Sequence, residues 1–108
     1  MFGFEDKTEY QLVIEFADSS PESFQRVTDL EMLLDAELKN GEVDGNDVGQ
    51  GIINIFIITK YPDKCFIEAM SHTKSANLEP TAAGYRPVDG EDYIRLWPNA
   101  DKSPFELK

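Results

Sequence analysis

The chain has 108 residues, and its 21 acidic side chains outnumber 10 basic ones to give a formal net charge of −11. This length suits one domain, and a content of 41% hydrophobic and 11% aromatic residues excludes an intrinsically disordered protein. The negative charge argues against nucleic-acid backbones and anionic membranes as partners, because both attract proteins of the opposite sign.

The first part of the chain predicts a strand followed by a helix. Apolar side chains alternate along residues 9–16, and Val13 on the opposite side favours an interior strand. A serine, a proline and a glutamate at 19–22 match a helix start, with the serine as the cap and the proline in the first turn.

This first helix is expected to continue through Leu38. Asn40 and Gly41 are expected to end it with a left-handed turn. At 100° per residue, one arc of the helix is apolar and should face the core. That arc comprises Val27, Leu30, Leu33, Leu34 and Leu38, with Phe24 at its edge.

The second half of the chain predicts a hairpin, a helix and short strands. Glycines and polar residues at 42–51 predict a weak strand and a turn, and 52–59 is apolar on both sides, as in a central strand. Pro62 begins a second helix that should fray near Asn77. Its inward stripe is Phe66, Ala69, Met70 and Thr73, extended segments follow at 82–87 and 93–97, and Phe105 and Leu107 anchor the tail.

This order predicts an α+β fold, a ferredoxin-like βαββαβ sandwich with one extra short strand. The sheet is expected to be antiparallel, with both helices on one face. The apolar first and third strands should lie parallel at its centre, with the polar second and fourth strands at its edges. One domain is expected over 1–108, with an ordered core at about 9–98 and flexible termini.

Two features of the sequence bear on the cellular compartment that we expect: the number of cysteines and the lack of a recognisable targeting signal. Cys65 is the single cysteine, which excludes an intramolecular disulfide and a zinc site built on cysteines. The N-terminus lacks the basic and apolar regions of a signal peptide, and the apolar run at 52–58 is interrupted by Asn54 and too short for a membrane span. A reducing cytoplasm is the expected location.

Neither glycine-rich motif predicts a ligand site. Asp44-Gly45-Asn46-Asp47 begins like a calcium loop, but Val48 and Ile55 occupy positions that require ligands, so a hairpin turn is favoured. The stretch at 49–51 precedes a strand and lacks the lysine of a phosphate loop. No metal and no cofactor are therefore expected.

Four short segments resemble those of a group of small, acidic, mostly uncharacterised bacterial proteins of similar length. The segments are VDGNDVGQG at 43–51, NIFIIT at 54–59, AGYR at 83–86 and LWP at 96–98. The resemblance implies the fold and a bacterial source. The chain departs from it at Tyr61-Pro62, where those proteins usually have Asp-Pro. By analogy of fold and charge, it also suggests an immunity protein, which blocks a toxin.

The negative charge is concentrated in the first half of the chain. Residues 1–47 have a net charge of −10 and residues 48–108 a net charge of −1. On the first helix, Met32 falls on the outward side with acidic residues on both flanks, which suits docking to a basic protein better than solubility alone. The partner-binding residues predicted on this basis are Glu31, Met32, Asp35, Glu42, Asp44 and Asp47.

The leading functional hypothesis is a cytoplasmic protein-binding module, in its most specific form an immunity protein that neutralises a basic toxin such as a nuclease. No nucleic acid or membrane is expected as a partner, and a homodimer is left open. The alternative is a small enzyme or ligand-binding domain with a pocket between sheet and helices. That pocket would comprise His72, Tyr85, Arg86 and Trp97. A structural or regulatory subunit is the third hypothesis.

Overall fold

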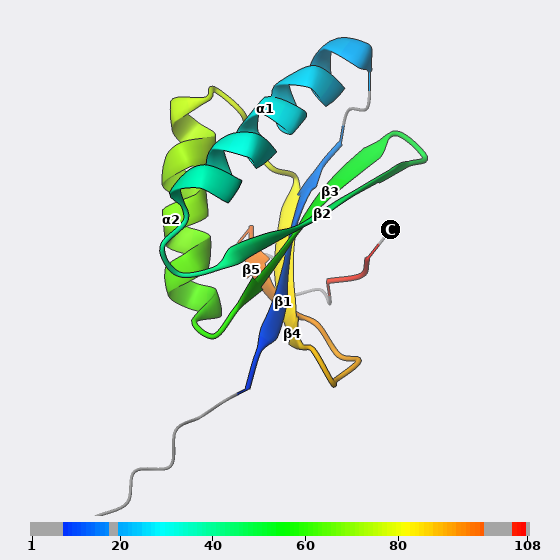
Figure 1. Ribbon diagram of the computed structural model, residues 1–108. Helices are drawn as coiled ribbons and strands as arrows, with labels where there is room; N and C mark the ends of the chain where they lie inside the picture. Colours follow the sequence, from blue (N-terminus) through cyan, green and yellow to red (C-terminus); the bar gives the residue numbers. More distant parts are fainter. Residues whose placement is uncertain (1–7, 18–19, 99–104, 108) are drawn as a thin grey trace, which may run out of the picture.

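The computed structural model describes residues 8–17, 20–98 and 105–107, which form a five-stranded antiparallel sheet with two helices on one face (Figure 1). The elements are β1 (Tyr10–Phe16), α1 (Pro21–Glu37), β2 (Glu42–Gly49), β3 (Ile52–Thr59), α2 (Pro62–Ser75), β4 (Ala82–Pro87) and β5 (Ile94–Trp97). The strands follow the order β2-β3-β1-β4-β5. The predicted α+β, ferredoxin-like sandwich is confirmed, and β5 is the extra strand.

Strand directions and one edge differ from the prediction. β1 and β3 are neighbours at the centre of the sheet, as expected, but they run antiparallel, with Leu12 opposite Ile57. The α1 connection brings β2 back parallel to β1, and the predicted hairpin then reverses the chain into β3, so the two central strands must run antiparallel. The polar β2 lies at one edge, but β5 covers β4 and takes the other edge.

Helix α1 begins as predicted. The Ser20 side chain accepts a hydrogen bond from the Ser23 backbone N–H at 3.3 Å, and Pro21 follows in the first turn. Val27, Leu30 and Leu34 are buried against the sheet. Two residues of the predicted stripe, Leu33 and Phe24, are instead exposed, because the face that contacts the sheet is narrower than the apolar arc.

The end of α1 is stabilised by a residue from α2 and not by a left-handed turn. Leu38 has an extended backbone, and neither Asn40 nor Gly41 is among the residues with positive φ. Instead, the Glu68 carboxylate accepts hydrogen bonds from the Lys39 N–H at 2.8 Å and the Asn40 N–H at 3.1 Å. This carboxylate therefore joins the two helices and orients the chain as it enters β2.

Glu68 should make the stability of the fold depend on pH. Burial raises the pKa of Glu68, but hydrogen bonds from Lys39 and Asn40 and the charge of His72 lower it, and the net pKa lies below the ordinary 4.5. A carboxylate with a lowered pKa stabilises the fold above its unfolded pKa, and this stabilisation is lost as the pH falls through the folded pKa.

Replacing Glu68 with alanine should therefore lower the free energy of unfolding by about 1–2 kcal/mol at neutral pH. The difference from wild type should shrink at a pH well below 4.5, once the pH falls through the lowered pKa of Glu68 and the carboxylate becomes protonated. Urea unfolding at both pH values measures this. The exposed Glu37 of α1 is the control, and an equal loss in Glu37→Ala would contradict the role assigned to Glu68.

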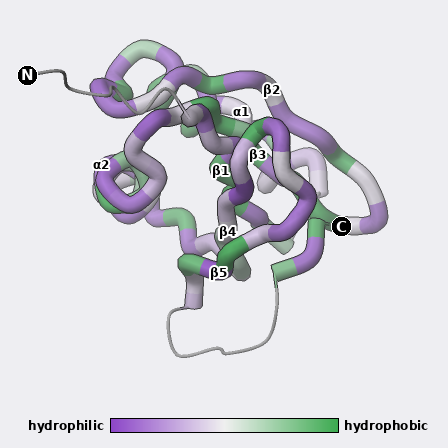
Figure 2. The backbone as a smooth tube through the Cα atoms, turned by 90° about the horizontal axis from the view of Figure 1, so that it is seen from below, coloured by the Kyte–Doolittle hydropathy of each residue, from purple (hydrophilic) through white to green (hydrophobic). Residues whose placement is uncertain are grey.

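The β2–β3 hairpin is as predicted, with one irregularity. Gln50 and Gly51 have φ values of 54° and 79°, which is typical of a tight two-residue turn. Gly45 has a φ of 106° at a shift in register between Val43 and Asn46. This shift is a bulge, and Figure 2 shows hydrophilic residues along this edge strand.

The two faces of the sheet bury different residues. The helix side holds the main core, which the helices form together with residues of the two central strands, Leu12, Ile14, Phe16, Ile53, Ile55 and Ile57. Cys65, Ala69 and Thr73 are the buried residues of α2, while Phe66 and Met70 are only partly buried. On the outer face Phe105 is buried against Val13 and Ala82, which confirms it as an anchor of the tail, whereas Leu107 is exposed.

Candidate functional site

A groove lies between α1 and the edge strand β2, and we call it the acidic groove. It has a volume of about 310 Å³. Its lining residues are Thr28, Glu31, Met32 and Asp35 of α1 with Val43, Gly45 and Asn46 of β2. Met32 is 66% exposed, and Asn46 donates a hydrogen bond to Glu31 at 2.6 Å. An exposed apolar side chain thus lies beside two carboxylates.

The register of β2 decides which side chains can join the acidic groove. Val43 lies opposite Ile57 and Asn46 opposite Ile55, and both isoleucines belong to the core on the helix side. Directly opposed residues of an antiparallel pair project from the same face, so Val43 and Asn46 project toward α1.

The same register places Glu42 and Asp47 on the outer face, because they lie opposite Ile58 and Asn54. Asp44 is exposed within the bulge. The structure therefore brings together Glu31, Met32 and Asp35 of the predicted partner-binding residues, and it separates Glu42 and Asp47 from them. The acidic residues form two surfaces on opposite faces of the sheet edge.

The only basic residue within α1 is Arg26, and it is engaged elsewhere. Its guanidinium donates hydrogen bonds to the carbonyl oxygens of Ala76 at 3.3 Å and Asn77 at 2.9 Å, at the end of α2. A cation there complements the negative end of the α2 dipole. Arg26 does not line the acidic groove, whose ionisable lining residues are both acidic.

The four residues of the alternative pocket do not converge. Tyr85 faces the helix side and packs edge-on against Tyr10, with ring centroids 5.5 Å apart. Arg86 projects from the opposite face, where it donates to the carbonyl oxygens of Val88 and Gly90, each at 2.9 Å. These bonds hold the β4–β5 turn, so Arg86 has a structural role here.

His72 lies on α2, and Trp97 lies on β5 opposite Ala83. Burial raises the pKa of the Glu68 carboxyl group, and its hydrogen bonds lower it. The charge of His72 lowers this pKa further, by less than the hydrogen bonds do. Trp97 packs near Phe66, with ring centroids 6.5 Å apart, and donates to the Pro80 carbonyl at 3.1 Å.

Sequence reasoning missed two surface hollows that Trp97 helps to line. One, of about 410 Å³, is lined by Phe66, Ile67, Met70, Ser71, Lys74 and Trp97. A second, of about 320 Å³, shares Met70, Lys74 and Trp97 and extends to Glu79 and Pro80. The signal in the sequence was Ile67, an apolar residue outside the inward stripe of α2.

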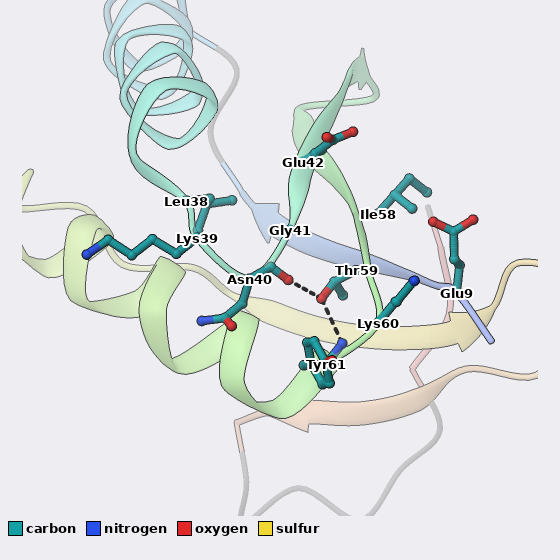
Figure 3. Close-up of a pocket in the computed structure, with 10 residues that line it drawn as sticks. All are labelled: Glu9, Leu38, Lys39, Asn40, Gly41, Glu42, Ile58, Thr59, Lys60 and Tyr61. Carbon is teal, nitrogen blue, oxygen red and sulfur yellow. Dashed lines mark hydrogen bonds between the residues drawn. The ribbon is translucent and has the colours of Figure 1, made fainter. Parts of the chain in front are cut away.

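A further pocket of about 400 Å³ lies where the α1–β2 connection meets the end of β3 (Figure 3). Thr59 is its central hydroxyl, and it donates to the Asn40 carbonyl and accepts from the Tyr61 N–H at 2.9 Å. Its charged lining residues are two acids and two bases, Glu9, Lys39, Glu42 and Lys60. The threonine hydroxyl therefore joins two chain segments, which is a structural role.

Cys65 lies close to Gly41, one of the lining residues, and is buried, so it should be unreactive in the folded protein. Burial raises the pKa of the thiol to about 11, against the lowering effect of a hydrogen bond with Thr59. The ordinary pKa of 9.0 returns on unfolding. We therefore expect iodoacetamide to label Cys65 at least about a hundredfold more slowly in native buffer than in denaturant. Equal rates, measured by mass spectrometry, would contradict a buried thiol.

The described part of the chain holds no group of three or more His, Cys, Asp and Glu side chains placed to bind a metal ion. Among the same residues, neither helix has the length and apolar character needed to cross a membrane. Comparison of the chain with known protein families, characterised proteins and solved structures finds no match to any of them. The resemblance to small acidic bacterial proteins stays a prediction from the sequence.

Proposed function

We propose that this chain is a protein-binding module that docks a basic protein in the acidic groove between α1 and β2. The observation that carries the proposal is the groove itself, in which the exposed Met32 lies beside Glu31 and Asp35. An apolar contact surrounded by charge of one sign is typical of the surfaces that recognise partners of the opposite sign.

The charge of the whole chain supports the same role. A net charge of −11 accelerates encounter with a cationic protein at low salt and disfavours encounter with nucleic acids. A basic nuclease is a suitable partner, because an acidic protein that covers its cationic surface competes with the nucleic-acid substrate. In this form the chain is a cytoplasmic immunity protein.

The geometry supports the ligand-binding or enzyme alternative less well. Of its four residues, Arg86 faces away from the helices and Tyr85 is packed against Tyr10. The hollows beside Trp97 are open surface features, lined mainly by side chains of α2.

Capture from a bacterial lysate tests the proposal. The immobilised chain is expected to retain a basic protein, identified by mass spectrometry, whose nuclease activity is lost when the chain is added in equal amount. Replacing Glu31, Asp35, Asp44 and Asp47 with lysine is expected to abolish capture. Capture that persists in this variant would show that the acidic residues serve only solubility.

A further inference from the structure

The polar side chains that line the acidic groove offer mainly hydrogen-bond acceptors. Glu31 and Asp35 contribute carboxylates, and Asn46 uses its Nδ2 to donate to Glu31 Oε1 at 2.6 Å, so its Oδ1 is left as an acceptor. Thr28 adds a hydroxyl, which both donates and accepts. A group that satisfies this lining when a partner covers the groove must therefore bring donors and positive charge.

The spacing of the two carboxylates allows them to share one cation. Glu31 and Asp35 are four residues apart on α1, a spacing at which side chains are neighbours and like charges repel. The hydrogen bond from Asn46 holds the Glu31 carboxylate through Oε1 and does not involve Oε2. A cation between the two acids would remove a repulsion that Arg26 does not relieve, because its guanidinium is bonded to the end of α2.

The apolar part of the groove suits a long, flexible stem. Met32 is 66% exposed, and Val43 projects from β2 toward α1. The volume of about 310 Å³ lies at the lower end of the range for ligand pockets, which leaves room inside for a single long side chain. A methylene stem packed on Met32 would place its charged end beside the carboxylates of α1.

Arginine meets these requirements better than lysine does. A guanidinium presents five N–H donors in a planar fork, so it can donate to two carboxylates at once. It is also more weakly hydrated than an ammonium, and it therefore leaves water beside Met32 at a lower cost in free energy. The lysine ammonium is a compact, strongly hydrated group with three donors, which suits one carboxylate better than two.

We infer that the acidic groove recognises an arginine side chain of its partner. The arginine stem packs against Met32 and Val43, and its guanidinium lies between Glu31 and Asp35. In this arrangement Asn46 is a positioning residue, because its hydrogen bond orients the Glu31 carboxylate. The inference rests on the proposed function, and it names the side chain by which a basic protein is recognised.

Two peptides of equal length and charge test the inference. A peptide of alternating glycine and arginine and its lysine counterpart are titrated into the isotope-labelled chain at about physiological salt, and the amide signals are followed by NMR. The arginine peptide is expected to bind at least about fivefold more tightly than the lysine peptide. The largest shifts should occur at Glu31, Met32, Asp35 and the side-chain amide of Asn46.

Variants that preserve side-chain shape separate recognition from overall charge. Glu31→Gln/Asp35→Asn should weaken binding of both peptides and abolish the preference for arginine. Glu42→Gln/Asp47→Asn removes the same charge from the outer face and should keep that preference. Asn46→Ala changes no charge, and it should reduce the preference because the Glu31 carboxylate is then no longer oriented.

The outcomes distinguish this inference from the proposed function. Equal affinities of the two peptides for the groove would overturn the assignment of arginine, while docking of a basic protein would stand. Shifts that are absent from the groove with both peptides, or that Glu31→Gln/Asp35→Asn leaves unchanged, would overturn the assignment as well. Capture from the lysate, and its loss on charge reversal, decides the proposed function separately.

Discussion

Replacing Gly41 with alanine is expected to lower the free energy of unfolding by about 2–3 kcal/mol. A Cβ atom at this position would lie 2.7 Å from Cys65 Sγ and 2.9 Å from Ile57 Cγ2, closer than such atoms can approach. It would also lie 3.1 Å from the backbone oxygen of Ile58, which cannot move without disturbing β3. The melting temperature should fall by roughly 8–20 °C for a domain of this size.

Gly49 provides the matched control for this substitution. A Cβ atom there meets nothing within 4 Å, and the residue does not have a positive φ, so Gly49→Ala should leave stability almost unchanged. Combining Gly41→Ala with Cys65→Ala should recover part of the loss, since one of the two closest atoms is removed. Equal melting temperatures for the Gly41 and Gly49 variants would contradict the close approach of α2 to the α1–β2 connection.

The position of the strands could be predicted from the sequence because it follows from local polarity. The apolar residues of β1 and β3 need burial on both sides, and this places the two strands at the centre. The end of α1 could not be predicted in this way. Its stabilising group is Glu68, which lies 28 residues beyond Asn40 and reaches it only after the two helices have packed.

The acidic groove was only partly predictable for a different reason. Helical spacing correctly places Glu31 and Asp35 on one side of α1, one turn apart. On β2, simple alternation would place Asp47 on the same face as Val43. The bulge at Gly45 shifts the alternation, so that Asn46 joins Val43 and Asp47 moves to the outer face.

The prediction of the alternative pocket was inconsistent with the alternation of side chains along a strand. Tyr85 and Arg86 are consecutive residues of a strand, and consecutive side chains of a strand project from opposite faces. They cannot line one pocket against the helices. Burial and the charge of Asp63 raise the pKa of Tyr85, which is consistent with its packed position on the helix side.

Charge reversal in the acidic groove is expected to have the largest effect on function. In Glu31→Lys/Asp35→Lys, the groove changes from acidic to basic, and Glu31 also loses its hydrogen bond with Asn46. Affinity for a basic partner should fall by at least about a hundredfold, because like charges then meet across the interface. The fold should persist, since Asp35 is exposed and Glu31 is only partly buried.

The most direct measurement compares this variant with Glu42→Lys/Asp47→Lys by titration calorimetry against the captured partner. Both variants carry the same net charge of −7, so a difference between them cannot come from overall charge. If the partner docks in the acidic groove, the first variant loses binding and the second, altered on the outer face, keeps affinity within about tenfold of wild type. Equal affinities for the two variants, or loss in the second alone, would contradict docking between α1 and β2.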